Sequence, residues 1–178
     1  MTKRNNLVFI FLHVISWIFF VGLCIETGAL LVNFVFSLFK PEIVHNLYQK
    51  LDLSQMYNTS KMVYFGMYGF ILTISILKAY LFYVVVMLLL KLDMEKPFST
   101  YVAGKIKKIS YITLEIGIFS LVAREISKNM EHYGLESDKL NQFWVDGSAF
   151  LLMAAVIYVI ATIFSRGVEI QNENDLTV

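Results

Sequence analysis

The sequence predicts an all-α fold: an integral membrane four-helix bundle with a small helical extracytoplasmic cap. Three observations predict it. Hydrophobic residues make up 57% of the 178 residues and charged residues 16%, which is too apolar for an ordinary water-soluble domain. Four apolar segments follow one another along the chain, and about 20 such residues form a helix that crosses a bilayer. Lysines gather in the connection between the second and third segments.

The spans are expected, within a single domain covering residues 1–178, at residues 7–39, 62–90, 106–123 and 143–164. The first span ends before Lys40 and Pro41, because proline lacks the amide hydrogen that a helix needs. This span is longer than the roughly 7 to 15 apolar residues of a signal peptide, so we expect it to remain uncleaved. The third span is short and carries Glu115, so hydropathy supports it least.

The first two apolar segments are longer than a bilayer requires, and tilting absorbs only part of such an excess. Residues 29–39 would then lie at or beyond the outer membrane boundary. A large exposed apolar surface there would favour aggregation. We therefore expect these residues to pack against residues 42–60 and 125–144, which predicts the cap.

The distribution of lysine and arginine predicts the orientation. An even number of spans puts both termini on one side of the membrane, and the more basic side is usually cytoplasmic. With the termini inside, eight lysines and arginines fall in the inner segments and six in the outer segments. Five of the eight lie in residues 91–108, which we call the elbow. We therefore expect the elbow and both termini to be cytoplasmic.

The elbow is the first candidate functional segment. Ser99 is a predicted N-cap for a helix that begins at Thr100. The lysines could orient the protein among anionic lipid headgroups, or they could form a docking surface for an acidic or regulatory partner. The candidate residues are Lys96, Pro97, Phe98, Ser99, Lys105, Lys107 and Lys108.

Charged residues inside the spans form the second candidate group. A charge at the bilayer centre costs roughly 2.5 to 3.5 kcal/mol, so each should have a partner. Lys78 and Glu115 are predicted to pair across the second and third spans, and Glu26 and Arg124 to pair near the outer boundary. Tyr111 lies one turn before Glu115 and extends a polar stripe. Three interpretations of this stripe stay open: a structural ion pair, a cavity that senses a ligand, and a path that conducts protons or ions.

The sequence argues against several classes of function. A net charge of +1 is too small for direct binding to nucleic acid. The three histidines, His13, His45 and His132, fall in different segments without metal-ligand spacing. Cys24 is expected to be a small core residue. We therefore expect no catalytic residues, metal or cofactor, and a protein that is not an enzyme.

Two short motifs carry a resemblance to a known family. The Pro-Phe-Ser elbow is followed by an amphipathic helix entry, and the chain ends in a characteristic set of residues: Phe164, Arg166, Gly167, Glu169, Asp175, Leu176, Thr177 and Val178. Both motifs resemble the bacterial membrane family catalogued as domain of unknown function 2975. Lys96 stands where that family usually has asparagine before the proline.

The resemblance implies a multi-pass protein of the bacterial inner membrane with no established activity. Genes of this family often neighbour a small helix-turn-helix transcription regulator, which implies a membrane partner for that regulator. The leading hypothesis is therefore a membrane sensor or regulatory partner whose acidic tail, residues 165–178, docks on the elbow or forms one surface with it. The alternatives are a small transporter or channel that uses Lys78, Tyr111 and Glu115, and an immunity-type protein whose cap meets a toxic peptide. A homo-oligomer is also compatible with the sequence.

Overall fold

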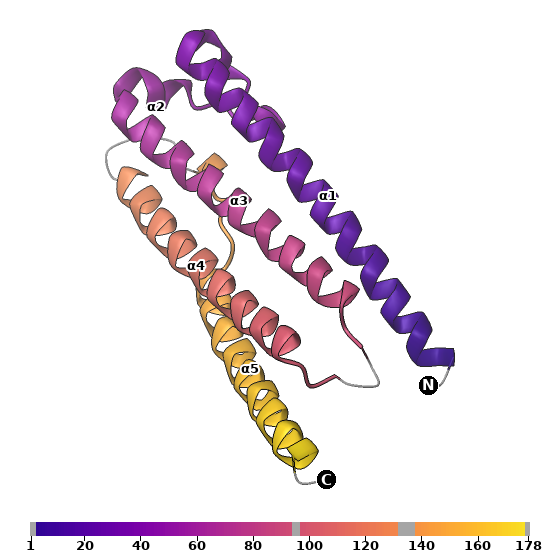
Figure 1. Ribbon diagram of the computed structural model, residues 1–178. Coiled ribbons are helices and arrows are strands. Elements are labelled where there is room, and N and C mark those ends of the chain that lie inside the picture. The colour runs from indigo at the N-terminus through magenta and orange to yellow at the C-terminus, as the bar shows by residue number, and fades with distance from the viewer. Residues whose placement is uncertain (1–2, 94–96, 132–137, 177–178) are drawn as a thin grey trace.

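The computed structural model describes residues 3–93, 97–131 and 138–176 (Figure 1). The described residues are almost entirely helical and form no β-sheet, which confirms the all-α prediction. The α-helices are α1 (Lys3–Phe39), α2 (Ser54–Thr59), α3 (Lys61–Leu90), α4 (Thr100–Glu131) and α5 (Gly147–Leu176). Three short 3-10 helices lie in the connections: η1 (Pro41–His45), η2 (Tyr48–Lys50) and η3 (Asp138–Leu140).

Three of the long helices have the length and apolar composition of membrane spans. These are Val8–Phe39 in α1, Lys61–Leu90 in α3 and Gly147–Glu173 in α5. The chain is therefore a membrane protein. Helix α4 is 32 residues long, but its lysines and Glu115 keep it outside this set. A fourth crossing by α4 stays a prediction.

The long helices lie side by side, with α3 between α1 and α4, and α5 against α4 (Figure 1). The N-terminus, the elbow and the C-terminus all lie at one end of the molecule, as the even number of long helices requires. Helix α2 lies at the opposite end. The two ends therefore differ in character: one carries the termini and the elbow, and the other carries the compact connections.

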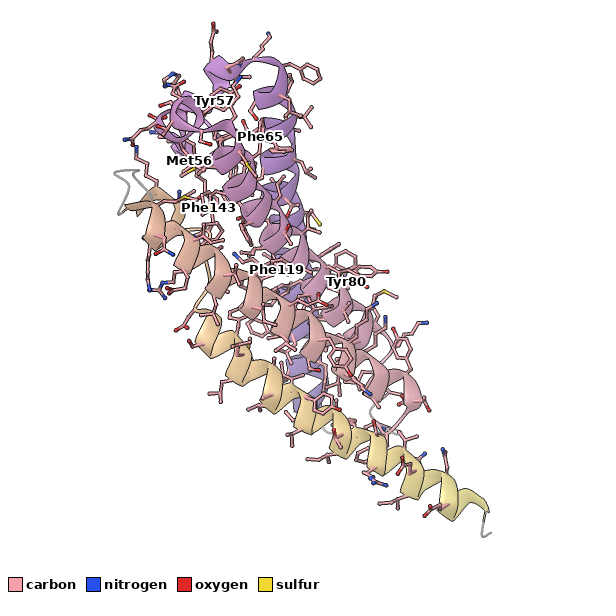
Figure 2. All side chains as sticks on the ribbon, turned by 90° about the vertical axis from the view of Figure 1, so that its left-hand side faces the viewer. Met56, Tyr57, Phe65, Tyr80, Phe119 and Phe143 are labelled. Atoms are coloured by element: carbon pink, nitrogen blue, oxygen red, sulfur yellow. The ribbon has the colours of Figure 1, made fainter. Side chains whose placement is uncertain are left out.

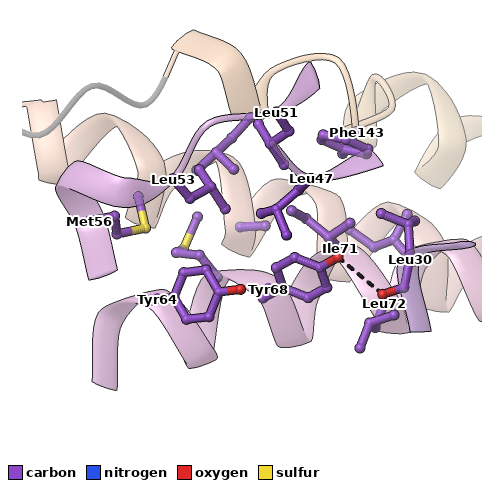
Figure 3. Close-up of a cluster of buried hydrophobic side chains, with 14 of the residues drawn as sticks. Leu30, Leu47, Leu51, Leu53, Met56, Tyr64, Tyr68, Ile71, Leu72 and Phe143 are labelled. Carbon is purple, nitrogen blue, oxygen red and sulfur yellow. Dashed lines mark hydrogen bonds between the residues drawn. The ribbon is translucent and has the colours of Figure 1, made fainter. Parts of the chain in front are cut away.

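The main hydrophobic core lies at this opposite end, which we call the cap. Figure 3 shows its buried side chains packed between α3 and the connecting segments. Tyr68 is fully buried and donates a hydrogen bond from its hydroxyl to the carbonyl oxygen of Leu30 in α1, at 3.0 Å. Figure 2 shows Met56, Tyr57, Phe65 and Phe143 together at this end. The segments predicted to pack as a cap, residues 29–39, 42–60 and 125–144, all contribute to this core.

The start of the last long helix differs from the prediction of residue 143. Phe143 and Trp144 are buried in the cap core, in the connection before α5. Helix α5 begins at Gly147, and Asp146 accepts a hydrogen bond from the amide of Ala149 at 3.1 Å. An aspartate that binds a free amide in the first turn is a typical N-cap. The apolar residues before Asp146 therefore pack within the cap and do not extend the helix.

Helices α4 and α5 pack tightly against each other at Gly117 and Gly147. A Cβ atom added at Gly147 would lie 2.5 Å from Cγ of Leu121 and 2.8 Å from the carbonyl oxygen of Gly117. At Gly66 and Gly69 of α3, by contrast, an added Cβ atom would meet no atom within 4 Å.

Asp52 stabilises the turn that leads into α2, and this predicts a pH-dependent stability. One oxygen of its carboxylate accepts hydrogen bonds from the Ser54 hydroxyl at 2.6 Å and the Ser54 amide at 3.0 Å. These bonds, the hydroxyl bond first, lower the pKa of Asp52 below its ordinary value. A carboxylate with a lowered folded-state pKa stabilises the protein above its unfolded-state pKa and loses that effect as the pH falls.

The variant Asp52→Asn should therefore melt at a lower temperature than the wild type at pH 7. The difference should shrink as the pH is lowered below about 4, where the wild-type carboxylate also becomes protonated. Thermal unfolding in detergent micelles between pH 7 and pH 3 measures this. A difference that stays constant across this range would show that the charge of Asp52 contributes nothing.

Candidate functional site at the elbow and the last helix

The elbow ends in a capped helix start, as the sequence predicted. The Ser99 hydroxyl accepts a hydrogen bond from the amide of Val102 at 3.3 Å, and α4 begins at Thr100. The Tyr101 hydroxyl donates to the carbonyl oxygen of Met87 near the end of α3, at 3.0 Å. Lys96 lies outside the described residues. These bonds tie the start of α4 to the end of α3 and so hold the elbow in place.

Phe98 joins the elbow to α5. Its ring centroid lies 5.3 Å from that of Phe164. A Cβ atom added at Gly167 would lie 2.5 Å from Cδ1 of Phe98, so the ring rests on a position where only glycine fits. We call these three residues the junction. The two motifs that carry the family resemblance are more than sixty positions apart in sequence and meet here.

The described elbow lysines all lie over tyrosine rings. Lys91 and Lys105 lie 5.0 and 5.4 Å from the centroid of the Tyr101 ring. Lys108 lies 4.9 Å from Tyr80, and Lys107 lies 6.0 Å from Tyr111. Ammonium groups are attracted to ring faces, and tyrosine is enriched at membrane–water interfaces. These four lysines, which we call the lysine collar, concentrate positive charge at the elbow end of α3 and α4.

Two hollows lie between α4 and α5 next to the junction. One, of about 310 Å³, is lined by Thr100 and Gly104 from α4 and by Val168 from α5. The other, of about 250 Å³, is lined by Tyr158 and Arg166. Both share the side chains of Lys107, Ser165 and Glu169.

The described part of the acidic tail is helical and contacts the elbow. Residues 165–176 continue α5 as a helix. The carboxylate of Glu169 binds Arg166 on the same helix at 2.8 Å, and it forms no ion pair with a described elbow lysine. Gly167 in the tail contacts the elbow at the ring of Phe98. The side chains of Asp175 and Leu176, and the whole of Thr177 and Val178, lie outside the described part of the chain.

Lys78 and Glu115 do not form the predicted pair. The ammonium group of Lys78 donates to the carbonyl oxygen of Phe143 at 3.4 Å, and its electrostatic neighbour is Glu26 on α1. Glu115 is exposed on α4. Lys78 turns toward the connection before α5, because the carbonyl groups of that non-helical segment need donors that a helix would otherwise supply.

The predicted pair of Glu26 and Arg124 is absent as well. Arg124 is exposed near the end of α4, whereas Glu26 is half-buried on α1 beside α3. Thr27, next to Glu26, donates to the carbonyl oxygen of Ser75 at 3.2 Å, which fixes this face of α1 against α3. Both pairing errors have one cause: depth along the membrane does not show which way a side chain faces around its helix.

The other polar candidates do not converge on a common site. Tyr111 is exposed and packs beside Tyr158, with ring centroids 6.2 Å apart. His13 accepts a hydrogen bond from the indole of Trp17 on its own helix. Among the described residues no cluster of histidine, cysteine and carboxylate side chains has the arrangement of a metal site. His132 lies outside the described residues. Cys24 is exposed, so its prediction as a core residue was wrong.

Sequence reasoning missed two features of this region. The Phe98 contact with Gly167 could not be found, because no local pattern links residues so far apart in sequence. The pairing of lysines with tyrosines had a partial signal: Lys107 and Tyr111 are four positions apart, as are Tyr101 and Lys105. Residues four apart face each other on a helix.

Comparison with known proteins agrees with the two motifs. The family described as "Protein of unknown function (DUF2975)" matches residues 48–178, which include the elbow, the junction and α5. No curated protein and no solved structure matches the chain. Because the match covers most of the sequence, the chain belongs to the family of unknown function DUF2975.

Proposed function

We propose that the chain is a non-enzymatic protein of the bacterial inner membrane that binds a cytoplasmic helix-turn-helix transcription regulator. In this proposal α4 is the fourth span, both termini are cytoplasmic, and the regulator binds the surface formed by the elbow and the end of α5. The observation that carries the proposal is the continuation of α5 as a helix from Phe164 to Leu176, held at its base by Phe98. The twelve residues after Phe164, residues 165–176, extend about 18 Å as a helix.

A projecting helix is a suitable binding element for a protein partner. Helices are commonly recognised by grooves that read side chains three, four and seven positions apart. Arg166 and Glu169 are exposed on this helix, and the lysine collar adds positive charge next to it. A regulator with a complementary charged surface would find both elements at one end of the molecule.

Helix α5 also connects the membrane-embedded helices to the proposed partner, so a movement of those helices would reach the binding surface. The first residue of α5, Gly147, is packed tightly on α4, and the segment before it is bonded to Lys78 of α3. A change in membrane state that shifts α3 against α4 would therefore move α5 as a rigid rod. The far end of that rod is the proposed binding surface, which is how the protein would act as a sensor.

The test is direct binding between the full chain in lipid nanodiscs and a purified helix-turn-helix regulator encoded next to a member of the family. Deleting residues 168–178 should abolish binding. Gly167→Leu, which displaces Phe98, should weaken binding at least about tenfold, or about 1.4 kcal/mol. Gly22→Leu is the matched control, since a Cβ there meets no atom within 4 Å. Unchanged binding by the deletion variant would refute the proposal.

A further inference from the structure

The hollow of about 250 Å³ between α4 and α5 has the features of an anion site at a membrane surface. It is lined by Lys107 from α4 and by polar and charged side chains of α5, among them Tyr158, Thr162, Arg166 and the carboxylate of Glu169. We propose that this hollow binds the phosphate of an anionic phospholipid, with Lys107 as the principal cation and Arg166 at its rim. This inference is independent of the regulator proposed above.

Lys107 and Arg166 bring positive charge to the hollow, and the carboxylate of Glu169 offsets that of Arg166, which leaves Lys107 as the cation without a carboxylate partner among the described residues. Lys107 is exposed and forms no ion pair with any described residue. Arg166 uses Nη1 to bind Glu169, and a guanidinium carries five N–H donors, so others remain for a ligand. The hydroxyl groups of Thr162 and Ser165 already donate to carbonyl oxygens of α5. A phosphate would therefore be held chiefly by the two cations.

The depth of the hollow favours a lipid over a soluble phosphate compound. Tyr158 lines it and packs beside Tyr111, and such tyrosines mark the headgroup level. On the membrane side, α5 exposes apolar side chains, among them Leu152, Val156 and Val159. Acyl chains can lie along this surface while the phosphate occupies the hollow.

Lys105 is a suitable comparison for Lys107 in a test of the proposed site. Lys105 lies on the same helix and over a tyrosine ring, yet it does not line either hollow. Any lysine near the membrane surface attracts anionic lipid through general electrostatics. A specific site predicts that Lys107 and Lys105 differ, whereas general attraction predicts that they are equivalent.

The test uses the full chain purified with mild detergent from vesicles of equal phosphatidylglycerol and phosphatidylcholine, with retained lipid counted by native mass spectrometry. Lys107→Gln should lower retained phosphatidylglycerol at least about tenfold, because it removes both the general attraction of one surface lysine, about fivefold, and a direct charged contact with the phosphate. Lys105→Gln should lower it by no more than about fivefold, the general effect alone, because its side chain does not line the hollow. Thr162→Trp, which fills the hollow without changing charge, should match the loss caused by Lys107→Gln.

Three outcomes would overturn the proposal. Equal losses for Lys107→Gln and Lys105→Gln would show diffuse surface attraction. Equal retention of the two lipids would show apolar contact without phosphate recognition by charge. Displacement of the lipid by millimolar glycerol 3-phosphate would identify a soluble phosphate compound as the ligand. Circular dichroism of each variant verifies that the helices are intact, so a loss of lipid reports the site.

Discussion

Replacing Gly147 by alanine is expected to destabilise the protein by about 1 to 3 kcal/mol, the usual range for overpacking a tight contact. The new Cβ atom would lie 2.8 Å from the carbonyl oxygen of Gly117 and 2.5 Å from Cγ of Leu121. The first of these is backbone, so the two helices must move apart. Denaturant titration in mixed micelles measures the change in the free energy of unfolding.

Gly69→Ala is the matched control for this prediction. A Cβ at Gly69 meets no atom within 4 Å, and alanine favours a helix interior by up to about 1 kcal/mol over glycine. The control should therefore be neutral or stabilising. Equal destabilisation by the two variants would mean that the α4–α5 contact contributes no more than any other helix position.

Replacing Lys78 by methionine is expected to cost about 2 to 3 kcal/mol, since it removes the donor to the Phe143 carbonyl group and a cation that is attracted to Glu26. Methionine keeps most of the side-chain volume, so packing changes little. The carbonyl oxygen of Phe143 would lose the ammonium group 3.4 Å away. The same denaturant titration measures the loss.

A double-mutant cycle distinguishes the observed neighbour of Lys78 from the one that the sequence suggested. Lys78→Met combined with Glu26→Gln should show a coupling of at least about 0.5 kcal/mol. Lys78→Met combined with Glu115→Gln should be additive within about 0.5 kcal/mol, because Glu115 is exposed on α4. A larger coupling to Glu115 than to Glu26 would contradict the structure.

Local patterns predicted the features that depend on nearby residues. The apolar segments became long helices, and Ser99 became the cap of α4 because its hydroxyl reaches an amide three positions away. Residues 29–39 were expected to need cover, and the cap core contains residues from this segment. Each of these follows from helix geometry and from the cost of exposing apolar surface.

Predictions failed where a residue's partner was distant in sequence. Lys78 was paired with Glu115 from depth alone, but rotation around the helix directs it to Phe143. Phe143 was placed inside the last span from hydropathy alone, but the cap core buries it. Hydropathy records that a residue avoids water and does not record whether lipid or protein replaces the water.

By itself the sequence determined that the chain is an all-helical membrane protein, which segments form its long helices, and how the elbow is capped. The tertiary structure alone decided that Phe98 packs on Gly167, that α4 and α5 meet at two glycines, and that Lys78 bonds the connection before α5. The physical reason is the distance along the chain over which each kind of interaction acts. Helix formation and membrane insertion depend on neighbouring residues, whereas contacts between helices depend on their rotation and offset, which no local pattern contains.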